Sequence, residues 1–179
     1  MSPIPVFGVE SSIPRECAGF SFSEATYYDD PKLGISIRYY GPSLIYANTY
    51  LYNLGRSYIT DDLESPEVMQ WFQEACHGIL RYAELGSYLN LEEVNSKFLY
   101  LPQDDSDPFC LWASFIYNPA PGPGISYTGQ LMSHIALRTD RGFINKVRFS
   151  YPYTEEISEV GRKGFLHFLL EWTHAVQNF

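Results

Sequence analysis

The chain has 179 residues, 45% hydrophobic and 17% aromatic, a composition that excludes an intrinsically disordered protein. Its formal net charge is −9, and residues 1–110 carry 16 acidic against 6 basic residues. A negative field repels phosphate backbones and anionic lipid, so nucleic acid and membrane surfaces are excluded as expected partners. No apolar run reaches the roughly 18 residues of a transmembrane helix, so membrane insertion is not expected either.

The N-terminus predicts an extended lead-in over residues 1–18, followed by a single domain over residues 19–179. The start, MSPIPVFGVESS, has neither a basic nor an apolar segment and therefore does not predict a signal peptide. The compartment stays open: cytoplasmic for the chain as it stands, periplasmic or cell-envelope if a leader was removed.

The stretch FSFSEATYYDDPKLGISIRYYG predicts a hairpin that turns at Asp29–Gly34, where acids, a proline and a glycine occur together. The next strand, from Ile45 to Tyr52, alternates between two faces. Small and aliphatic residues occupy one face, whereas the other face carries Tyr46, Asn48, Tyr50 and Tyr52.

A helix is predicted to begin at Ser65 as cap and Pro66 as first residue, and to end at Gly86. Apolar residues recur at spacings of three and four along it, so one face should lie on a sheet. Its predicted buried stripe consists of Val68, Met69, Trp71, Phe72, Ala75, Cys76, Ile79, Leu80 and Ala83.

The second half of the chain continues with strands and a final helix. SYLNLEEVNSKFLYLP predicts one or two short strands, and FCLWASFIYNP predicts a central strand covered on both faces. A second hairpin should turn at Thr139–Gly142, and a long helix should begin at Thr154. Gly161 and Gly164 would each cost that helix about 1 kcal/mol relative to alanine, which a close approach to the sheet would offset.

This order of elements predicts an α+β fold: a single antiparallel sheet of about six to eight strands, packed by two main helices. The three cysteines, Cys17, Cys76 and Cys110, are predicted to be buried thiols. A Cys17–Cys110 bridge is the alternative if the protein is exported.

The standard nucleotide, hydrolase and metal signatures are missing from the sequence. The four histidines, His77, His134, His167 and His174, are dispersed, so neither a metal site nor a cofactor is predicted. Asp104, Asp105 and Asp107 lack the rest of an EF-hand pattern and predict a solvated acidic loop. The acidic residues of Asp61–Glu64 precede the first helix, where the helix dipole accounts for them.

One candidate site is left, an aromatic and cationic patch formed by Arg38, Tyr40, Tyr46, Tyr50 and Tyr52. If the sheet face that carries these residues is open, they form a recognition surface; if a helix covers it, they belong to the core. Both interpretations stand at the level of sequence.

The overall order, ending in VRFSYPYTEEISEVGRKGFLHFLLEW, resembles the PsbP-like α/β/α sandwich. The block YYDDPKLGISIRYYGPSLIYANTYLYNLG is also similar to uncharacterised bacterial envelope proteins with a DP-x-LG-x-S-x-RY hairpin and a strand ending in Tyr-x-Leu-Gly. The matching residues are Asp30, Pro31, Leu33, Gly34, Ser36, Arg38, Tyr39, Tyr52, Leu54 and Gly55. The resemblance implies a binding or assembly role and brings no catalytic set.

The expected function is therefore a non-catalytic binding or assembly module, placed by the resemblance in the bacterial cell envelope. The expected partner is a protein or a small molecule, and the expected state is a monomer or weak oligomer. The alternative is a hydrolase with a dispersed site that combines one histidine with Ser126, Ser133 or a carboxylate.

Overall fold

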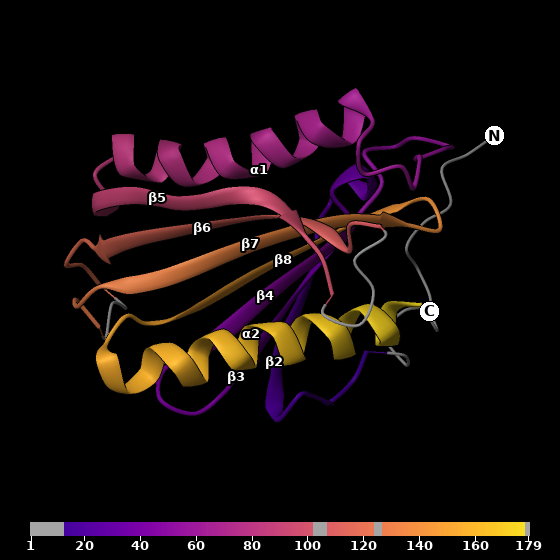
Figure 1. The fold of residues 1–179 in the computed structure, drawn as a ribbon. Coiled ribbons are helices and arrows are strands. Elements are labelled where there is room, and N and C mark those ends of the chain that lie inside the picture. Colours follow the sequence, from indigo (N-terminus) through magenta and orange to yellow (C-terminus); the bar gives the residue numbers. More distant parts are fainter. Residues whose placement is uncertain (1–12, 102–106, 124–126, 178–179) are drawn as a thin grey trace.

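The computed structural model describes residues 13–101, 107–123 and 127–177. Its eight strands form one curled antiparallel sheet in the order β1-β2-β3-β4-β8-β7-β6-β5, with two long helices, which confirms the predicted α+β fold (Figure 1). The strands are β1 (Glu16–Cys17), β2 (Phe20–Tyr27), β3 (Ile35–Tyr40), β4 (Tyr46–Tyr52), β5 (Tyr88–Leu99), β6 (Cys110–Pro119), β7 (Leu131–Asp140) and β8 (Phe143–Pro152). The helices are α1 (Pro66–Glu84), α2 (Glu155–Val176) and the short 3-10 helix η2 (Pro31–Leu33).

The N-terminal part of the sheet is the predicted hairpin of β2 and β3, with η2 in its turn. Gly34 follows η2 with φ +64°, and a Cβ atom there would lie 1.9 Å from the Leu51 carbonyl oxygen, so glycine is required. The sheet begins before residue 19, because β1 already pairs with β2 and Ile13 is buried in the core. The rest of the predicted lead-in, residues 1–12, lies outside the described residues.

Strand β4 connects the two halves of the sheet. It pairs with β3 on one side and with β8 on the other, and its register sets Asn48 opposite Arg148 and Tyr50 opposite Lys146. Basic residues from the C-terminal hairpin therefore lie beside the tyrosines of the N-terminal half.

The region predicted as one or two short strands is one long strand, β5, with register shifts near its middle. Strand β6 is covered on both faces, as predicted: Leu111 and Phe115 lie under α1, whereas Cys110 and Ile116 belong to the core on the opposite face. All three cysteines are free thiols, with Cys17 and Cys110 buried and Cys76 half-buried.

Helix α1 begins as predicted, with the Ser65 Oγ accepting a hydrogen bond from the Val68 backbone N–H at 3.3 Å. Its apolar face buries Trp71 and Phe72 against β6, β7 and β8. The predicted stripe was too wide at one position, because Leu80 is 37% exposed.

Helix α2 begins at its predicted cap, Thr154, and buries an aromatic-rich face against the other side of the sheet. A Cβ atom on Gly161 would lie 2.5 Å from the Tyr151 ring, so this glycine permits the close approach that was expected. At Gly164 the nearest atom would be 3.5 Å away, an ordinary contact, so the expectation is wrong there: no close approach accounts for Gly164.

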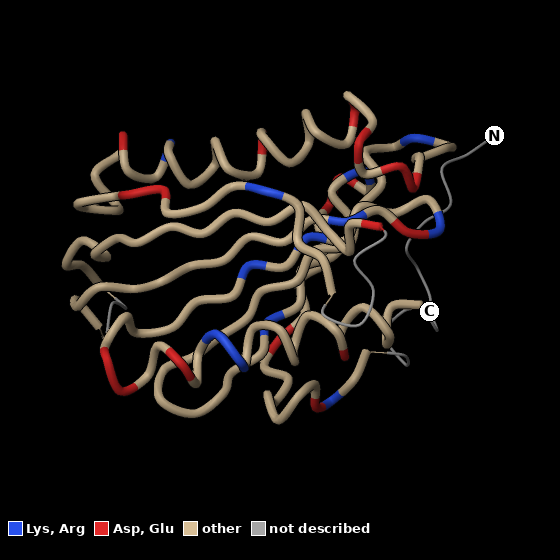
Figure 2. The backbone as a smooth tube through the Cα atoms, viewed as in Figure 1, with Lys and Arg blue, Asp and Glu red and all other residues tan. Residues whose placement is uncertain are grey.

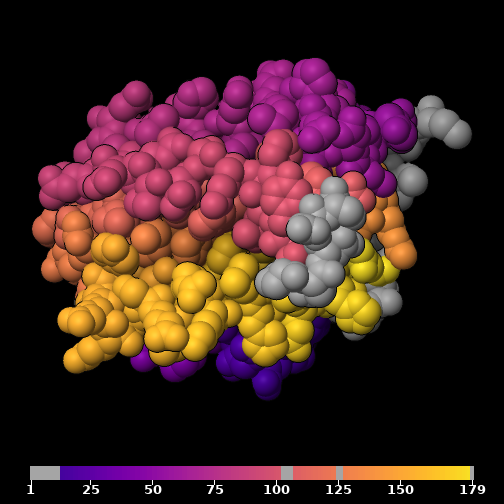
Figure 3. Space-filling model, in the orientation of Figure 1, coloured from indigo at the N-terminus to yellow at the C-terminus, as the bar shows by residue number. Residues whose placement is uncertain are grey.

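The two helices cover opposite faces and different halves of the sheet. Helix α1 packs on β5, β6 and β7, whereas α2 packs on β8 and β1 (Figure 1). Figure 3 shows the edge strand β5 at the surface between them. On the α1 side, β3 and β4 consequently lie beside the helix rather than beneath it. In the described part of the chain, neither helix is long and apolar enough to cross a bilayer.

Candidate ligand-binding cleft

A cleft of about 540 Å³ lies on the α1 side of the sheet, where the helix leaves β3 and β4 uncovered. Seven tyrosines line it, and we call it the tyrosine cleft. Its lining residues are Arg38, Tyr40, Leu44, Tyr46, Asn48, Tyr50, Tyr82, Tyr88, Tyr117, Pro119, Tyr127, Leu131 and Arg148. The volume is typical of pockets that hold a small organic molecule.

The structure brings together four of the five residues predicted from the sequence, since Arg38, Tyr40, Tyr46 and Tyr50 all line this cleft. Tyr52 lies apart, in a neighbouring cavity, where it packs against the core under α1. The tyrosine face is thus neither an open surface nor a sealed core, but the half-buried wall of a concave site.

Arg148 lies at the centre of the cleft and was not among the predicted site residues. From β8 its side chain reaches across β7 toward the far edge of the sheet. Its Nη2 donates hydrogen bonds to the hydroxyls of Tyr88 on β5 at 2.8 Å and Tyr117 on β6 at 2.9 Å. Its Nε donates to the Ser133 Oγ on β7 at 3.2 Å, so one side chain connects four strands.

In the described part of the chain, the groups that accept hydrogen bonds from the Arg148 guanidinium are all neutral hydroxyls. No Asp or Glu is among the described residues that line the cleft, and none lies within ion-pair distance of this guanidinium. Burial alone would lower the pKa of Arg148, but the hydroxyls of Tyr117, Tyr88 and Tyr46 outweigh burial and raise that pKa. The side chain therefore stays a cation under all ordinary conditions.

The hydrogen-bond directions at this cation leave donors for a ligand. A guanidinium can only donate, so the oxygens of Tyr88 and Tyr117 act as acceptors and their own O–H groups point elsewhere. The Arg148 Nη1 makes no hydrogen bond to any described residue. The Tyr117 hydroxyl is also hydrogen-bonded to that of Tyr46, so the Tyr88 O–H and the Arg148 Nη1 are the two donors left beside the positive charge for an anion.

Aromatic rings supply a flat wall beside the cation. The rings of Tyr88 and Tyr117 are stacked with centroids 4.0 Å apart, and the Tyr82 ring lies 5.3 Å from that of Tyr88. Tyr50, on β4, adds another ring to the lining of the cleft. Rings in this arrangement can hold a planar or apolar group by stacking and dispersion.

Arg38 occupies the outer rim. It is exposed, forms an ion pair with Glu24 at 2.7 Å, and donates from Nε to the Asn48 Oδ1 at 2.9 Å. Its charge is already compensated, so Arg38 contributes less to the cleft than Arg148 does. Figure 2 shows basic residues within strands of the sheet, and acidic residues on the helices, on the connecting segments and on the edge strand β5.

A pattern in the sequence indicates part of the environment of Arg148, the site residue that the prediction missed. Lys146, Arg148 and Ser150 alternate with apolar residues along β8 and so share one face. What the sequence does not contain is the pairing of β8 with β4, which lies far away along the chain.

Of the groups named for the alternative hydrolase, Ser133 and His134 do not form a catalytic pair. His134 is buried, accepts a hydrogen bond from Trp112 Nε1 at Nδ1 at 3.3 Å, and lies 3.2 Å from the Tyr151 hydroxyl. Burial lowers the pKa of His134 to about 3. Ser133 points to the opposite face of β7 and is bonded to Ser150 at 2.9 Å, while Ser126 lies outside the described residues.

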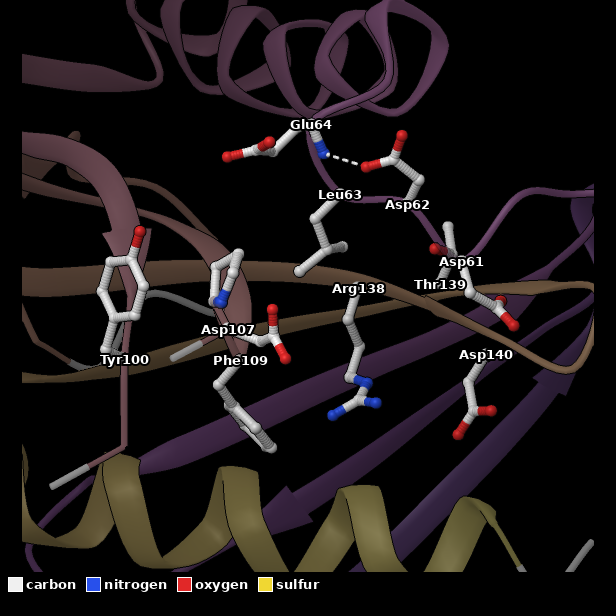
Figure 4. Close-up of a pocket in the computed structure, with 11 residues that line it drawn as sticks. Asp61, Asp62, Leu63, Glu64, Tyr100, Asp107, Phe109, Arg138, Thr139 and Asp140 are labelled. Atoms are coloured by element: carbon white, nitrogen blue, oxygen red, sulfur yellow. Dashed lines mark hydrogen bonds between the residues drawn. The ribbon is translucent and has the colours of Figure 1, made fainter. Parts of the chain in front are cut away.

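A second cavity, of about 530 Å³, lies at the start of α1 and is lined by the acidic residues around Leu63 (Figure 4). The Asp62 carboxylate accepts a hydrogen bond from the Glu64 backbone N–H at 2.9 Å, so it stabilises the turn before α1, whose cap is Ser65. Asp107 also lines this cavity, whereas Asp104 and Asp105 are outside the described residues. Over residues 13–101, 107–123 and 127–177, no His, Cys, Asp or Glu cluster has the geometry of a metal site.

Comparison with known proteins leaves the geometry as the sole guide to function. No family model matches the chain, and no curated protein matches its sequence. The resemblance to PsbP-like sandwiches thus stays a prediction, and the antiparallel α+β architecture is the level at which the chain can be classified.

Proposed function

We propose that the protein is a non-catalytic binding module, and that its tyrosine cleft takes a small molecule with an anionic group on a flat apolar body. The observation that carries this proposal is the position of Arg148, a half-buried cation that hydrogen-bonds neutral hydroxyls and has no described carboxylate partner. A placement in the bacterial cell envelope belongs to the same proposal.

The energetics favour an anion in this cleft. Withdrawing a cation from water is costly, and hydroxyl oxygens compensate that cost only in part. A carboxylate or phosphate oxygen beside Nη1 would form a charge-assisted hydrogen bond, which is roughly twice as strong as a neutral one. The stacked rings of Tyr88 and Tyr117 would hold the apolar part of the same ligand.

A hydrolase is less well supported, because Ser133 and His134 point to opposite faces of β7. In addition, the hydrogen bond from Trp112 occupies the Nδ1 of His134, and burial keeps its imidazole neutral.

Binding of benzoate tests the proposal, with benzamide and acetate as probes that lack the charge and the ring respectively. We expect benzoate to bind at least about tenfold more tightly than either, measured by calorimetry and by the NMR signal of the Arg148 Nε–H group. The variant Arg148→Gln should lose this preference, whereas Arg162→Gln, an exposed arginine on α2, should keep it. Equal affinity for benzoate and benzamide, or an unchanged preference in a folded Arg148→Gln protein, would refute the proposal.

A further inference from the structure

Next to the tyrosine cleft lies a smaller cavity of about 390 Å³, between β4, β8 and α1. Tyr50 lines both cavities and forms their shared wall. The smaller cavity is mainly apolar and aromatic, with Tyr52, Trp71 and Leu54 around it, and contains one amine, that of Lys146.

Lys146 lies among aromatic rings rather than carboxylates. Its Nζ is 4.1 Å from the centre of the Tyr50 ring and 5.8 Å from that of Tyr52. No described carboxylate lies within ion-pair distance of this Nζ, and no described residue is hydrogen-bonded to it. Arg148, two residues further along β8 and on the same face, is a second cation close by.

The three other lysines of the chain have different surroundings. Lys163 is exposed and paired with Glu159 at 2.7 Å. Lys97 lies over the Trp112 ring at 5.6 Å, on an exposed stretch of β5, and Lys32 lies in the exposed turn of the first hairpin. Among the lysines, Lys146 alone combines a cavity, a neighbouring cation and the lack of a described carboxylate partner.

These surroundings favour the neutral, nucleophilic form of the amine. Burial and the charge of Arg148 lower the pKa of Lys146 to about 8, although the face of the Tyr50 ring acts in the opposite sense by stabilising the ammonium. With that pKa about one tenth of the side chains are free amines at pH 7, whereas an ordinary lysine has less than about one in a thousand. Enzymes that form Schiff bases activate lysine by the same means, desolvation and a nearby cation.

We propose that Lys146 is a covalent binding site for small aldehydes, which it takes up as imines. The lone pair of the neutral Nζ attacks the carbonyl carbon, and the carbonyl π electrons move to oxygen, which gains a proton to give a carbinolamine. Loss of the second N–H proton and departure of the hydroxyl as water then form the C=N bond. One aldehyde and one amine thus give one imine and one water, with no oxidant or reductant.

Glu74 is the described acid that lines the same cavity, and because it lies beyond ion-pair distance of the Nζ it would move the protons of these steps through one bridging water. Its Oε1 accepts a hydrogen bond from the Gln70 Nε2 at 3.0 Å, which holds the carboxyl group in position on α1. In this role Glu74 is a positioning and proton-transfer residue, while the bond forms at Lys146.

Reductive trapping tests the proposal. The full chain is incubated with limiting propanal near pH 7.5, reduced with borohydride, and mapped by mass spectrometry of its peptides. We expect propyl-lysine at Lys146 to exceed that at Lys163 at least about tenfold, since the fraction of free amine at Lys146 exceeds that of an ordinary lysine by more than that. Labelling that follows exposure, with Lys163 or Lys32 ahead of Lys146, would overturn the proposal.

Three variants and a pH series complete the test. Lys146→Arg should remove the dominant adduct, Lys163→Arg should leave it unchanged, and Glu74→Gln should slow its formation while circular dichroism shows an intact fold. Labelling at Lys146 should rise with a midpoint near the pKa of about 8. The titratable and charged groups that face the amine there are Tyr28, Tyr50, Tyr52, Glu74 and Arg148. A labelling midpoint near that of an ordinary lysine contradicts the proposed site. An unchanged rate of adduct formation in Glu74→Gln contradicts the role of Glu74. Both outcomes are independent of benzoate binding in the tyrosine cleft.

Discussion

The guanidinium of Arg148 and the hydroxyl of Tyr117 are hydrogen-bonded at 2.9 Å, although the two residues lie on strands that are not neighbours in the sheet. The arginine side chain passes over β7 to reach that hydroxyl. This contact joins the lining of the tyrosine cleft to strands β5 and β6 of the sheet. Arg148 and Tyr117 therefore contribute both to the proposed ligand site and to the stability of the fold.

Removing one hydroxyl from the lining of the tyrosine cleft should destabilise the protein. Tyr117 is 1% exposed, and in Tyr117→Phe the Arg148 Nη2 keeps only its bond to Tyr88. We expect a loss of about 1.5–3 kcal/mol in the free energy of unfolding, the usual value for a hydrogen bond to a charged group. Urea unfolding measures it. Tyr40→Phe, at a position 50% exposed in the same cleft, should change stability by less than about 0.5 kcal/mol. Equal effects of the two changes would contradict this account of Arg148.

The two glycines of α2 should respond to alanine in opposite directions. Gly164→Ala adds a methyl at ordinary contact distance from the Phe149 ring and should stabilise the protein by about 1 kcal/mol through helix propensity. Gly161→Ala places its methyl against the Tyr151 ring and should destabilise it by about 1–3 kcal/mol through overpacking. Thermal unfolding of both variants checks the signs. If both changes stabilise the protein, α2 lies further from the sheet at Gly161 than described.

His134 should make the protein sensitive to mild acid. The unfolded chain binds a proton at this imidazole below about pH 6.5, whereas burial lowers the pKa in the folded state to about 3. The unfolded state therefore holds more protons between these values, so this contribution to stability is complete above about pH 6.5 and is lost as the pH falls. The loss approaches about 1.4 kcal/mol per pH unit.

Urea unfolding at about pH 7, 6 and 5 measures this slope. His134→Phe should be less stable at neutral pH, because Trp112 and Tyr151 lose a hydrogen-bond partner, but its stability should fall less steeply with acid. His167→Gln, an exposed position on α2, should retain the wild-type slope. Identical slopes for wild type and His134→Phe would show that the folded-state pKa of His134 is not lowered.

Local structure was readable from the sequence where neighbouring residues determine it. Ser65 and Thr154 both cap helices as predicted, since a capping hydroxyl and the backbone N–H it accepts are three residues apart. The turn at Arg141 and Gly142 was readable for the same reason, because both residues adopt positive φ and glycine does so without cost. Leu80 and Gly164 were misjudged because periodicity shows which way a residue points, but not how far away its neighbour lies.

The sequence by itself determined the α+β class, the two helices with their caps, and the two faces of β4, because each depends on short-range periodicity and backbone preference. The tertiary structure alone decided that α1 lies over β5, β6 and β7 rather than over β3 and β4, and that Arg148 and Lys146 lie beside the tyrosines of β4. Strand order and helix placement arise from packing between segments that lie far apart along the chain. For that reason the tyrosines of β4 could be predicted from the sequence, whereas the position of Arg148 among them could be seen only in the folded chain.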